Sequence, residues 1–290
     1  MILVTGASGN AGRAVVDELR KTGAPFRAMY RSQEDAAKAP PDVATVIGDF
    51  SSSESMKNPL TGVDSVYLVC SPIPELVDLE SNVIDACRQS GVKHVVLNSS
   101  LGAADYPKSF PAWHRSVEDK LKASGLGFTI LRPNSFMQNI VAFLAPSIRE
   151  QGAFFAAMGD ASISYLDLRD IAAVVASVAE SPGEHRGKTY ELNGPEAVTS
   201  AELAQRIARV CNTEVKFVDI PEATQRSAML TMGMPEWRVD ALLDLQRYYT
   251  NGQGGEVTGV LPQLLGRPPV KLDSFLEEYK DSFLREVAHA

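Results

Sequence analysis

The stretch MILVTGASGNAGRAVVDELRKTG, residues 1–23, decides the fold of this chain. A short apolar run ends at Thr5, and three glycines follow at positions 6, 9 and 12 before an amphipathic segment. In a dinucleotide-binding turn, one glycine permits the sharp bend, another lets the backbone approach the pyrophosphate, and a third lets helix and strand pack closely. The spacing G-x-x-G-x-x-G differs from the commoner G-x-G-x-x-G. Its place between a strand and a helix is nevertheless the context that the motif requires.

The turn also lies where a helix begins, and there the free N–H groups and the helix dipole favour a phosphate. We therefore predict that the backbone from Ser8 to Ala11 binds the pyrophosphate of a dinucleotide. The alternative is a plain turn, because glycines often serve turns alone. The residues of the turn expected to contact the cofactor are Gly6, Ser8, Gly9, Asn10, Ala11 and Gly12.

The rest of the first half alternates short apolar runs with segments of helical period. Strands rich in Val, Ile and Leu that alternate with helices indicate β-α-β units and a parallel sheet buried on both faces. The clearest helix spans residues 76–91, where apolar residues recur at helical spacing and Gly91 offers a stop. The strands are expected at residues 2–5, 25–31, 44–48, 65–71, 94–99 and 128–133.

After residue 133 this rhythm loosens, which indicates a smaller lobe. The predicted fold is therefore α/β: a Rossmann-type, doubly wound parallel sheet with a smaller C-terminal α/β substrate lobe. We expect an NAD(P)-binding domain over residues 1–152 and a substrate lobe over most of residues 153–290, with the chain crossing between them more than once. The elements expected here are a helix at 135–152, a strand at 162–167, a helix at 167–181 capped by Asp167, a strand at 189–194, a helix at 199–211 that opens with the capping box Thr199 and Glu202, and a helical tail over 221–290 interrupted at 251–259.

Composition limits the classes of function. The net charge is −8 and the 28 Lys and Arg residues form no dense run, so nucleic-acid binding is not expected. No run of 18 apolar residues is present and the first residues do not resemble a signal peptide, so we expect a cytoplasmic protein that is not in the membrane. No metal site is expected, because the cysteines (70, 87 and 211) and histidines (94, 114, 185 and 289) show no ligand spacing.

The end of the second expected strand indicates which cofactor is bound. A site that prefers NAD usually has an acidic residue there for the ribose 2′-hydroxyl, whereas this chain has Arg31 and no carboxylate before Glu34. A guanidinium suits a 2′-phosphate through charge-assisted hydrogen bonds, and Arg13 is near enough in sequence to help. We therefore predict NADPH in preference to NADH. The alternative is that Arg31 is a solvated charge at a strand end.

Six segments taken together resemble the NmrA-like branch of the atypical short-chain dehydrogenases, a branch that includes quinone, dye and clavine reductases as well as NmrA regulators. The resemblance covers essentially the whole chain, with the motifs in the family order, and it concerns fold and cofactor more than substrate. The segments are VTGASGNAGRAVVDEL (4–19), GDF (48–50), VKHVVLNSS (92–100), SGLGFTILRPNSFMQN (124–139), YLDLRDIAAVVA (165–176) and LLGRPPVKLDSFLEEY (264–279).

The resemblance implies further cofactor contacts. It places two residues beside the adenine, four along the cofactor and two near the nicotinamide carboxamide, and it places a serine at the end of the fifth strand. Without the family context, the same motifs read as strand-end turns or a helix cap. The residues are Asp49 and Phe50; Val69, Cys70, Ser71 and Pro72; Pro133 and Asn134; and Ser99.

The resemblance also exposes a departure at the catalytic positions. An ordinary short-chain dehydrogenase uses a Ser together with a Tyr-x-x-x-Lys pair on the following helix. Here Ser99 or Ser100 occupies the serine region, but His114 and Glu118 stand where Tyr and Lys are expected. His114 is a candidate proton donor, and Ser100 a candidate hydrogen-bond partner of the substrate. The alternative is a histidine held by Glu118 one helical turn later.

Two functions follow. The first is an NADPH-dependent reductase that transfers hydride to a small aromatic or conjugated electrophile, such as a quinone, an imine or iminium, or a dye. The second is a non-catalytic, NAD(P)-sensing regulator of the NmrA type, which would need a protein partner; a homodimer is left open.

Seven large apolar residues in the second half of the chain could line a pocket for a flat substrate or form the core of the small lobe. We expect most of them to form core: Phe136, Met137, Phe143, Met229, Met232, Met234 and Trp237.

Overall fold

The structure, a computed structural model, describes residues 1–285 of the chain, so His289 lies outside the described residues. Two compact units are present. Unit 1 comprises Met1–Pro133 and Leu168–Glu191, and unit 2 comprises Asn134–Asp167 together with the chain from Leu192 onward. The boundary expected at residue 152 lies inside unit 2, and a segment expected in the substrate lobe lies in unit 1. The chain thus passes between the units three times.

Unit 1 contains a seven-stranded sheet in the order β3-β2-β1-β4-β5-β6-β9. The strands from β1 to β6 pair in parallel, and their order, 3-2-1-4-5-6, is that of a Rossmann-type sheet. The predicted fold class is therefore confirmed. The strands are β1 (Ile2–Val4), β2 (Phe26–Tyr30), β3 (Thr45–Ile47), β4 (Ser65–Leu68), β5 (His94–Asn98), β6 (Gly127–Pro133) and β9 (Lys188–Leu192).

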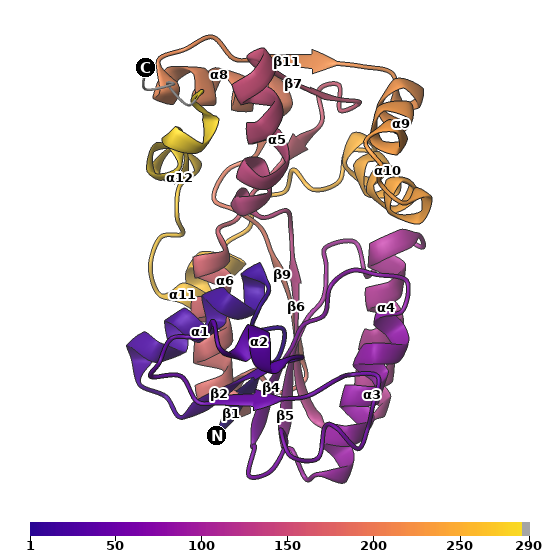
Figure 1. Cartoon of the computed structure of the whole chain (residues 1–290), viewed down its shortest axis with the longest axis vertical. Helices are drawn as coiled ribbons and strands as arrows, with labels where there is room; N and C mark the ends of the chain where they lie inside the picture. The colour runs from indigo at the N-terminus through magenta and orange to yellow at the C-terminus, as the bar shows by residue number, and fades with distance from the viewer. Residues whose placement is uncertain (286–290) are drawn as a thin grey trace. The chain divides into compact units, whose positions relative to one another are not determined.

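Helices cover both faces of this sheet (Figure 1). The helices α1 (Asn10–Thr22) and α6 (Leu168–Glu180) contact each other on one face, and α3 (Leu76–Gln89) and α4 (Ser109–Ala123) contact each other on the opposite face. The two short helices of unit 1 are α2 (Gln33–Ala36) and α7 (Pro182–His185). Between the sheet and the pair α3 and α4 lies a core in which Val66, Leu97 and Ile130 are fully buried.

Unit 2 has its own core, which explains where the units divide. The apolar face of α5 (Met137–Gln151) buries Met137 and Ile140 against Leu203 and Phe275, so this helix belongs to unit 2. The capping box predicted at Thr199 and Glu202 is present. The remaining elements are β7 (Ala153–Ala156), β8 (Ser162–Ile163), β10 (Val198–Thr199), α8 (Ser200–Cys211), β11 (Lys216–Asp219), α9 (Glu222–Thr231), α10 (Glu236–Thr250), α11 (Val260–Leu265), α12 (Leu272–Glu278) and the 3-10 helix η1 (Lys280–Phe283).

Two small sheets complete unit 2: β8 pairs antiparallel with β10, and β7 pairs parallel with β11. The strand expected at residues 162–167 is only two residues long. Among the helices that the structure describes, none is both long enough and apolar enough to cross a bilayer.

Candidate functional site

The glycine turn after β1 has the conformation that its sequence requires. Gly6 has a φ of +58°, and a Cβ there would lie 2.9 Å from Cγ1 of Val69 and 3.0 Å from its carbonyl oxygen. A Cβ on Gly12 would collide with the backbone oxygen of Gly6, so Gly12 allows α1 to pack against the turn. These two glycines are explained by the contacts of the chain itself.

Gly9 is different, and it provides the test of whether a cofactor fits. Its backbone is extended, at φ −85° and ψ 168°, and a Cβ would meet only the carbonyl oxygen of Gly6, at an ordinary 3.4 Å. No atom of the described chain therefore requires a glycine here. The space next to Gly9 is open at the N-terminal end of α1. There the first N–H groups have no partner within the helix, and no acidic side chain lies in the first turn. This arrangement fits a pyrophosphate.

The turn lies at the point where the strand order reverses, between β1 and β4. The hydroxyl of Thr5 donates to the carbonyl oxygen of Tyr67 at 2.9 Å and accepts from the N–H of Val69 at 3.0 Å. This bridge joins the end of β1 to the segment 69–72, which leaves the sheet because β4 ends at Leu68. Ligands of open α/β sheets bind outside the carboxyl ends of the strands at such a point.

Within the segment 69–72, Val69 and Cys70 are half-buried, and Ser71 and Pro72 are exposed. Burial raises the pKa of the Cys70 thiol to about 12, so the side chain is a neutral thiol and not a nucleophile. The half-buried Cys70 also packs against the core of unit 1, which agrees with a role in shaping the site.

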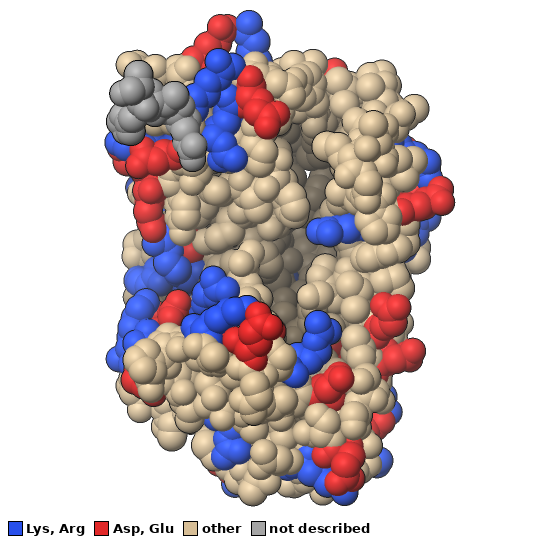
Figure 2. Space-filling view, in the orientation of Figure 1, with Lys and Arg blue, Asp and Glu red and all other residues tan. Residues whose placement is uncertain are grey.

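Arg31 lies at the end of β2 with its side chain exposed, and none of the ion pairs among the described residues involves it. The pKa of the Asp49 carboxyl group is lowered, mainly by hydrogen bonds from Ser51 and to a smaller extent by the positive charge of Arg31. Arg13 donates to the carbonyl oxygen of Ser8 at 3.2 Å. Where α1 and α2 lie in Figure 1, the space-filling view shows Lys and Arg side chains with acidic ones beside them (Figure 2).

The GDF segment forms a turn after β3 that serine residues hold. The N–H of Asp49 donates to the hydroxyl of Ser55 at 2.6 Å, and its carboxylate accepts from the N–H of Ser51 at 2.9 Å. Phe50 packs against the core of unit 1, and its carbonyl oxygen accepts from Asn82 at 3.0 Å. Asp49 and Phe50 are both half-buried.

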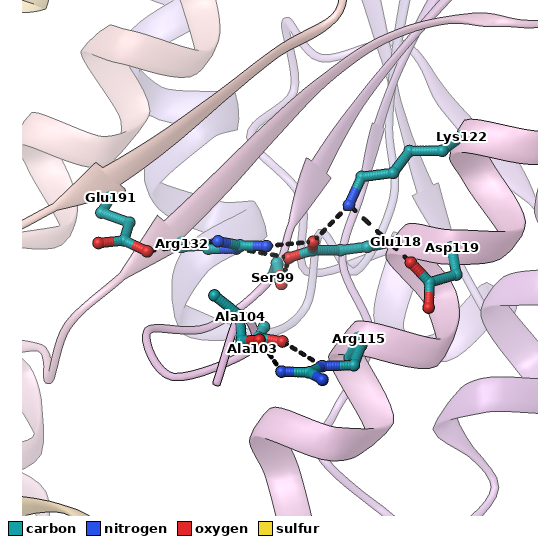
Figure 3. Close-up of polar contacts among 9 residues, drawn as sticks. All are labelled: Ser99, Ala103, Ala104, Arg115, Glu118, Asp119, Lys122, Arg132 and Glu191. Carbon is teal, nitrogen blue, oxygen red and sulfur yellow. Dashed lines mark hydrogen bonds and ion pairs between the residues drawn. The ribbon is translucent and has the colours of Figure 1, made fainter. Parts of the chain in front are cut away.

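Ser99, at the end of β5, belongs to a buried polar cluster with Glu118 of α4 and Arg132 of β6 (Figure 3). The Ser99 hydroxyl donates to Oε1 of Glu118 at 2.7 Å, and Arg132 donates to both carboxylate oxygens at 2.8 and 2.6 Å. Burial acts to raise the pKa of Glu118, but the hydrogen bonds from Arg132 and Ser99 outweigh it, so the pKa lies below its ordinary value. Glu118 is therefore a carboxylate, although its side chain is only 1% exposed.

His114 is not held by Glu118. Its side chain is buried, its Nδ1 has no hydrogen-bond partner among the described residues, and the Glu118 oxygens contact Ser99, Arg132 and Lys122 instead. Burial lowers the pKa of His114 to about 4, against a smaller opposing effect of the Glu118 charge. The ring is thus neutral near pH 7, unlike an unperturbed histidine, which titrates close to neutral pH.

Ser100 is the residue after Ser99, and its Oγ is also buried without a hydrogen-bond partner among the described residues. A buried hydroxyl without a hydrogen bond is uncommon in a folded protein and calls for a bound group or a special role.

The division between the units falls between Pro133 and Asn134. The carbonyl oxygen of Pro133 accepts from Leu101 at 2.9 Å within unit 1. The side-chain amide of Asn134 lies within unit 2, where Nδ2 is 2.9 Å from Ser164 Oγ and 2.8 Å from the carbonyl oxygen of Gly254. The Asn134 amide therefore makes its hydrogen bonds inside unit 2.

Glu80 of α3 was not expected at the site; it is fully buried, and its two carboxylate oxygens accept no well-formed hydrogen bond among the described residues. The backbone N–H of Cys70 acts to lower its pKa, but burial has the larger effect. Burial raises its pKa well above the ordinary value, so the group is a neutral acid. It lies near Cys70, at the end of β4. Helical spacing from Leu76 would have placed position 80 on the buried face.

The interpretation of the apolar set as core is wrong for most of its members. Met137 is buried, but Phe143 is 57% exposed, Met232 75% and Trp237 37%; the other three are half-buried. Unit 2 has a separate cavity of about 410 Å³, and none of this set lines it. The cavity is lined by Met158, Gly159, Asp160, Ala161, Ser162, Tyr249, Thr250 and Gly252.

Comparisons with known proteins agree with the geometry of the glycine turn, because they also indicate a protein that binds NAD(P)H. The sequence profile of a family described as NAD(P)H-binding matches residues 6–182. An NAD(P)H azoreductase of Xenophilus azovorans is 34% identical over 98% of this chain and 99% of its own length.

Two similar solved structures contain NADPH or NADP(H). The NADPH-dependent quinone oxidoreductase of Escherichia coli, in complex with NADPH, is 30% identical with a TM-score of 0.88, covering 96% of this chain and 99% of that one. A Citrobacter sp. triphenylmethane reductase complexed with NADP(H) has a TM-score of 0.86 over 96% of this chain and 99% of its own, and at 23% identity it shows the shared fold alone. The family resemblance drawn from the sequence is confirmed.

Proposed function

The chain belongs to the NAD(P)H-binding family, and from this premise we propose that it is an NADPH-dependent reductase that transfers hydride to a small aromatic or conjugated electrophile. The observation that carries the proposal is the glycine turn of unit 1, which is open at Gly9 in a chain whose full-length relatives at 30% identity or more are named as reductases or oxidoreductases. Azo dyes and quinones are the substrate classes that those names suggest.

In this proposal the cofactor is bound by backbone and by charge. The N–H groups at the start of α1 hold the pyrophosphate, the segment 69–72 lines the nicotinamide half, and Asp49 and Phe50 lie by the adenine. Arg31, which is exposed and outside every ion pair of the described residues, reads the 2′-phosphate and favours NADPH over NADH. When bound, NADPH supplies the hydride.

The residues around Ser100 determine how a proton reaches the product. Neither a Tyr nor a Lys occupies the expected places on α4, and the neutral His114 presents one ring donor and one acceptor. A cationic dye that gains hydride at carbon needs no proton there. A quinone needs one at oxygen, and we assign Ser100 and His114 as the groups that meet that oxygen or its proton.

The sensor alternative is less well supported. It rests on the missing Tyr and Lys and on two relatives at 25% identity whose names are not those of enzymes, a photosystem II assembly factor and a prestalk differentiation protein. The relatives at 30% identity or more over nearly the whole chain all carry the names of reductases or oxidoreductases. We also propose a cytoplasmic location, which suits three cysteines that are all free.

The test is turnover. The purified protein is mixed with NADPH and, in separate reactions, an azo dye, a quinone, a cationic triarylmethane dye and a simple aldehyde, and NADPH absorbance is followed. We expect oxidation of NADPH with at least one aromatic electrophile and little with the aldehyde. Tight NADPH binding without turnover of any compound would favour the sensor.

A further inference from the structure

Ser99, Glu118 and Arg132 join the carboxyl ends of neighbouring strands to a helix. Ser99 follows β5, Arg132 is the penultimate residue of β6, and Glu118 lies on α4 (Figure 3). Arg132 also reaches Glu191, the penultimate residue of β9, at 3.3 Å. The three residues, called the clamp below, thus lie at the sheet edge where an α/β fold binds its ligand.

Each charged group of the clamp is hydrogen-bonded to a partner of opposite charge. Three side chains donate to the Glu118 carboxylate, and each of the three guanidinium nitrogens of Arg132 has a carboxylate partner. Arg132 is 12% exposed and Glu118 1%, so water does not weaken the pair as it weakens a surface ion pair. The hydroxyl proton of Ser99 is committed to Glu118, and the residue is only 2% exposed.

Backbone hydrogen bonds hold the chain on both sides of Ser100, but its hydroxyl has no partner among the described residues. The N–H of Ser99 donates to the carbonyl oxygen of Leu131 at 2.8 Å, and the N–H of Leu101 donates to that of Pro133 at 2.9 Å. Arg115 of α4 holds the turn that follows, through Nε to the carbonyl oxygen of Ala103 at 2.6 Å (Figure 3). A fixed backbone beside a buried hydroxyl that lacks a partner among the described residues is an arrangement in which a bound group can satisfy that hydroxyl.

We propose that the clamp is a positioning device of the reductase site: it takes the hydroxyl of Ser99 out of substrate binding and presents the adjacent hydroxyl of Ser100 to the reducible oxygen or nitrogen of the substrate. The proposal rests on the proposed function. Glu118 takes the place of the expected lysine, but a carboxylate supplies no cation, and its negative charge is paired with Arg132 from β6. Ser100 donates a hydrogen bond to the substrate atom on which negative charge develops.

The first experiment compares Ser99→Ala with Ser100→Ala, two deletions of one hydroxyl at adjacent positions. We expect Ser100→Ala to lower kcat with a quinone at least tenfold while the urea midpoint and NADPH affinity stay unchanged, because its Oγ has no hydrogen bond to lose within residues 1–285. We expect Ser99→Ala to lower the urea midpoint, and Ser99→Thr to restore it. A kcat loss confined to Ser99→Ala, with Ser100→Ala unchanged, overturns the proposal.

The second experiment separates positioning from stability. Glu118→Gln and Arg132→Met each leave a buried partner unsatisfied and should lower the urea midpoint, whereas the double variant Glu118→Leu/Arg132→Leu should regain much of it. If the clamp positions Ser100, kcat of the double variant stays at least tenfold below wild type while its midpoint recovers. Recovery of both quantities assigns the clamp a structural role alone and overturns the proposal.

Lys120→Met is the matched control, since it removes an ion pair of the same helix, to Asp85 at 2.9 Å, whose two side chains are each 39% exposed. Its kcat and midpoint should equal those of wild type. Absence of turnover in wild type itself would refute the proposed function. The urea midpoints of the clamp variants would still measure how much the buried pair of Glu118 and Arg132 contributes to stability.

Discussion

At the scale of single residues, the three glycines of the first turn have separable roles. Gly6 and Gly12 are required by contacts inside the chain, but Gly9 faces open space and has a backbone that any residue adopts. The need for glycine at position 9 therefore comes from a ligand. This assignment leads to a substitution that affects binding and leaves folding intact.

Gly9→Val should weaken NADPH binding on the order of 100-fold or more, because the valine methyl groups fill the space the pyrophosphate needs. The free energy of unfolding should change by less than about 1 kcal/mol. Titration of NADPH fluorescence and urea unfolding measure the two effects. The control is Gly23→Ala at the end of α1, where φ is +73° and no atom is near: it should cost about 1 kcal/mol of stability and leave binding unchanged.

Arg31 predicts cofactor choice. Arg31→Ala should weaken NADPH binding by about 1.5–3 kcal/mol, because a charge-assisted contact to the 2′-phosphate is lost. NADH, which has no such phosphate, should bind as before. The measurement is the pair of dissociation constants at one ionic strength, with Lys21→Ala as an exposed-charge control on α1. Equal losses for NADPH and NADH would show that another group reads the phosphate.

At the scale of elements, strands and helices were predictable because their signals are local. The expected strands 2–5, 25–31 and 94–99 match β1, β2 and β5 within one residue at each end. Both β1 and β5 are runs of Val, Ile and Leu, as buried parallel strands usually are. The clamp was not predictable. Arg132 lies 14 positions from Glu118, and only the packing of α4 on β5 and β6 brings them together.

The helix α3 contains the clearest element-scale test, its buried Glu80. A raised pKa means that the folded state holds a proton which the unfolded state releases. The stability that this proton provides is complete below the unfolded pKa and is lost as pH rises toward the folded value. Wild type should therefore lose stability relative to Glu80→Gln by about 1.4 kcal/mol per pH unit above roughly pH 5.

Urea unfolding of both proteins at pH 5, 6, 7 and 8 measures that difference. It should widen steadily with pH, because the other titrating groups are common to both proteins and cancel. A constant difference across the series would mean that Glu80 is ionised in the folded state and has a partner.

At the scale of the whole molecule, the division into units is what the sequence predicted least well. The helix α5 was expected with the nucleotide domain, but its apolar face packs in the core of unit 2, and α6, expected in the second lobe, packs on α1. Periodicity reports that a helix has a buried face, and it does not report which core receives that face. Phe143, Met232 and Trp237 belong to a set of which most members were expected in the core of the small lobe, and these three are exposed.

The whole molecule is proposed to move one hydride from NADPH to an aromatic electrophile, and the fate of that hydride tests the account most directly. NADPH deuterated at either face of C4 is mixed with a cationic triarylmethane dye, whose reduced carbon keeps what it receives, and the product is examined by mass spectrometry. We predict one deuterium on that carbon from one of the two labelled cofactors, and none from either with Gly9→Val. A product without deuterium from both, while NADPH still binds, would contradict it.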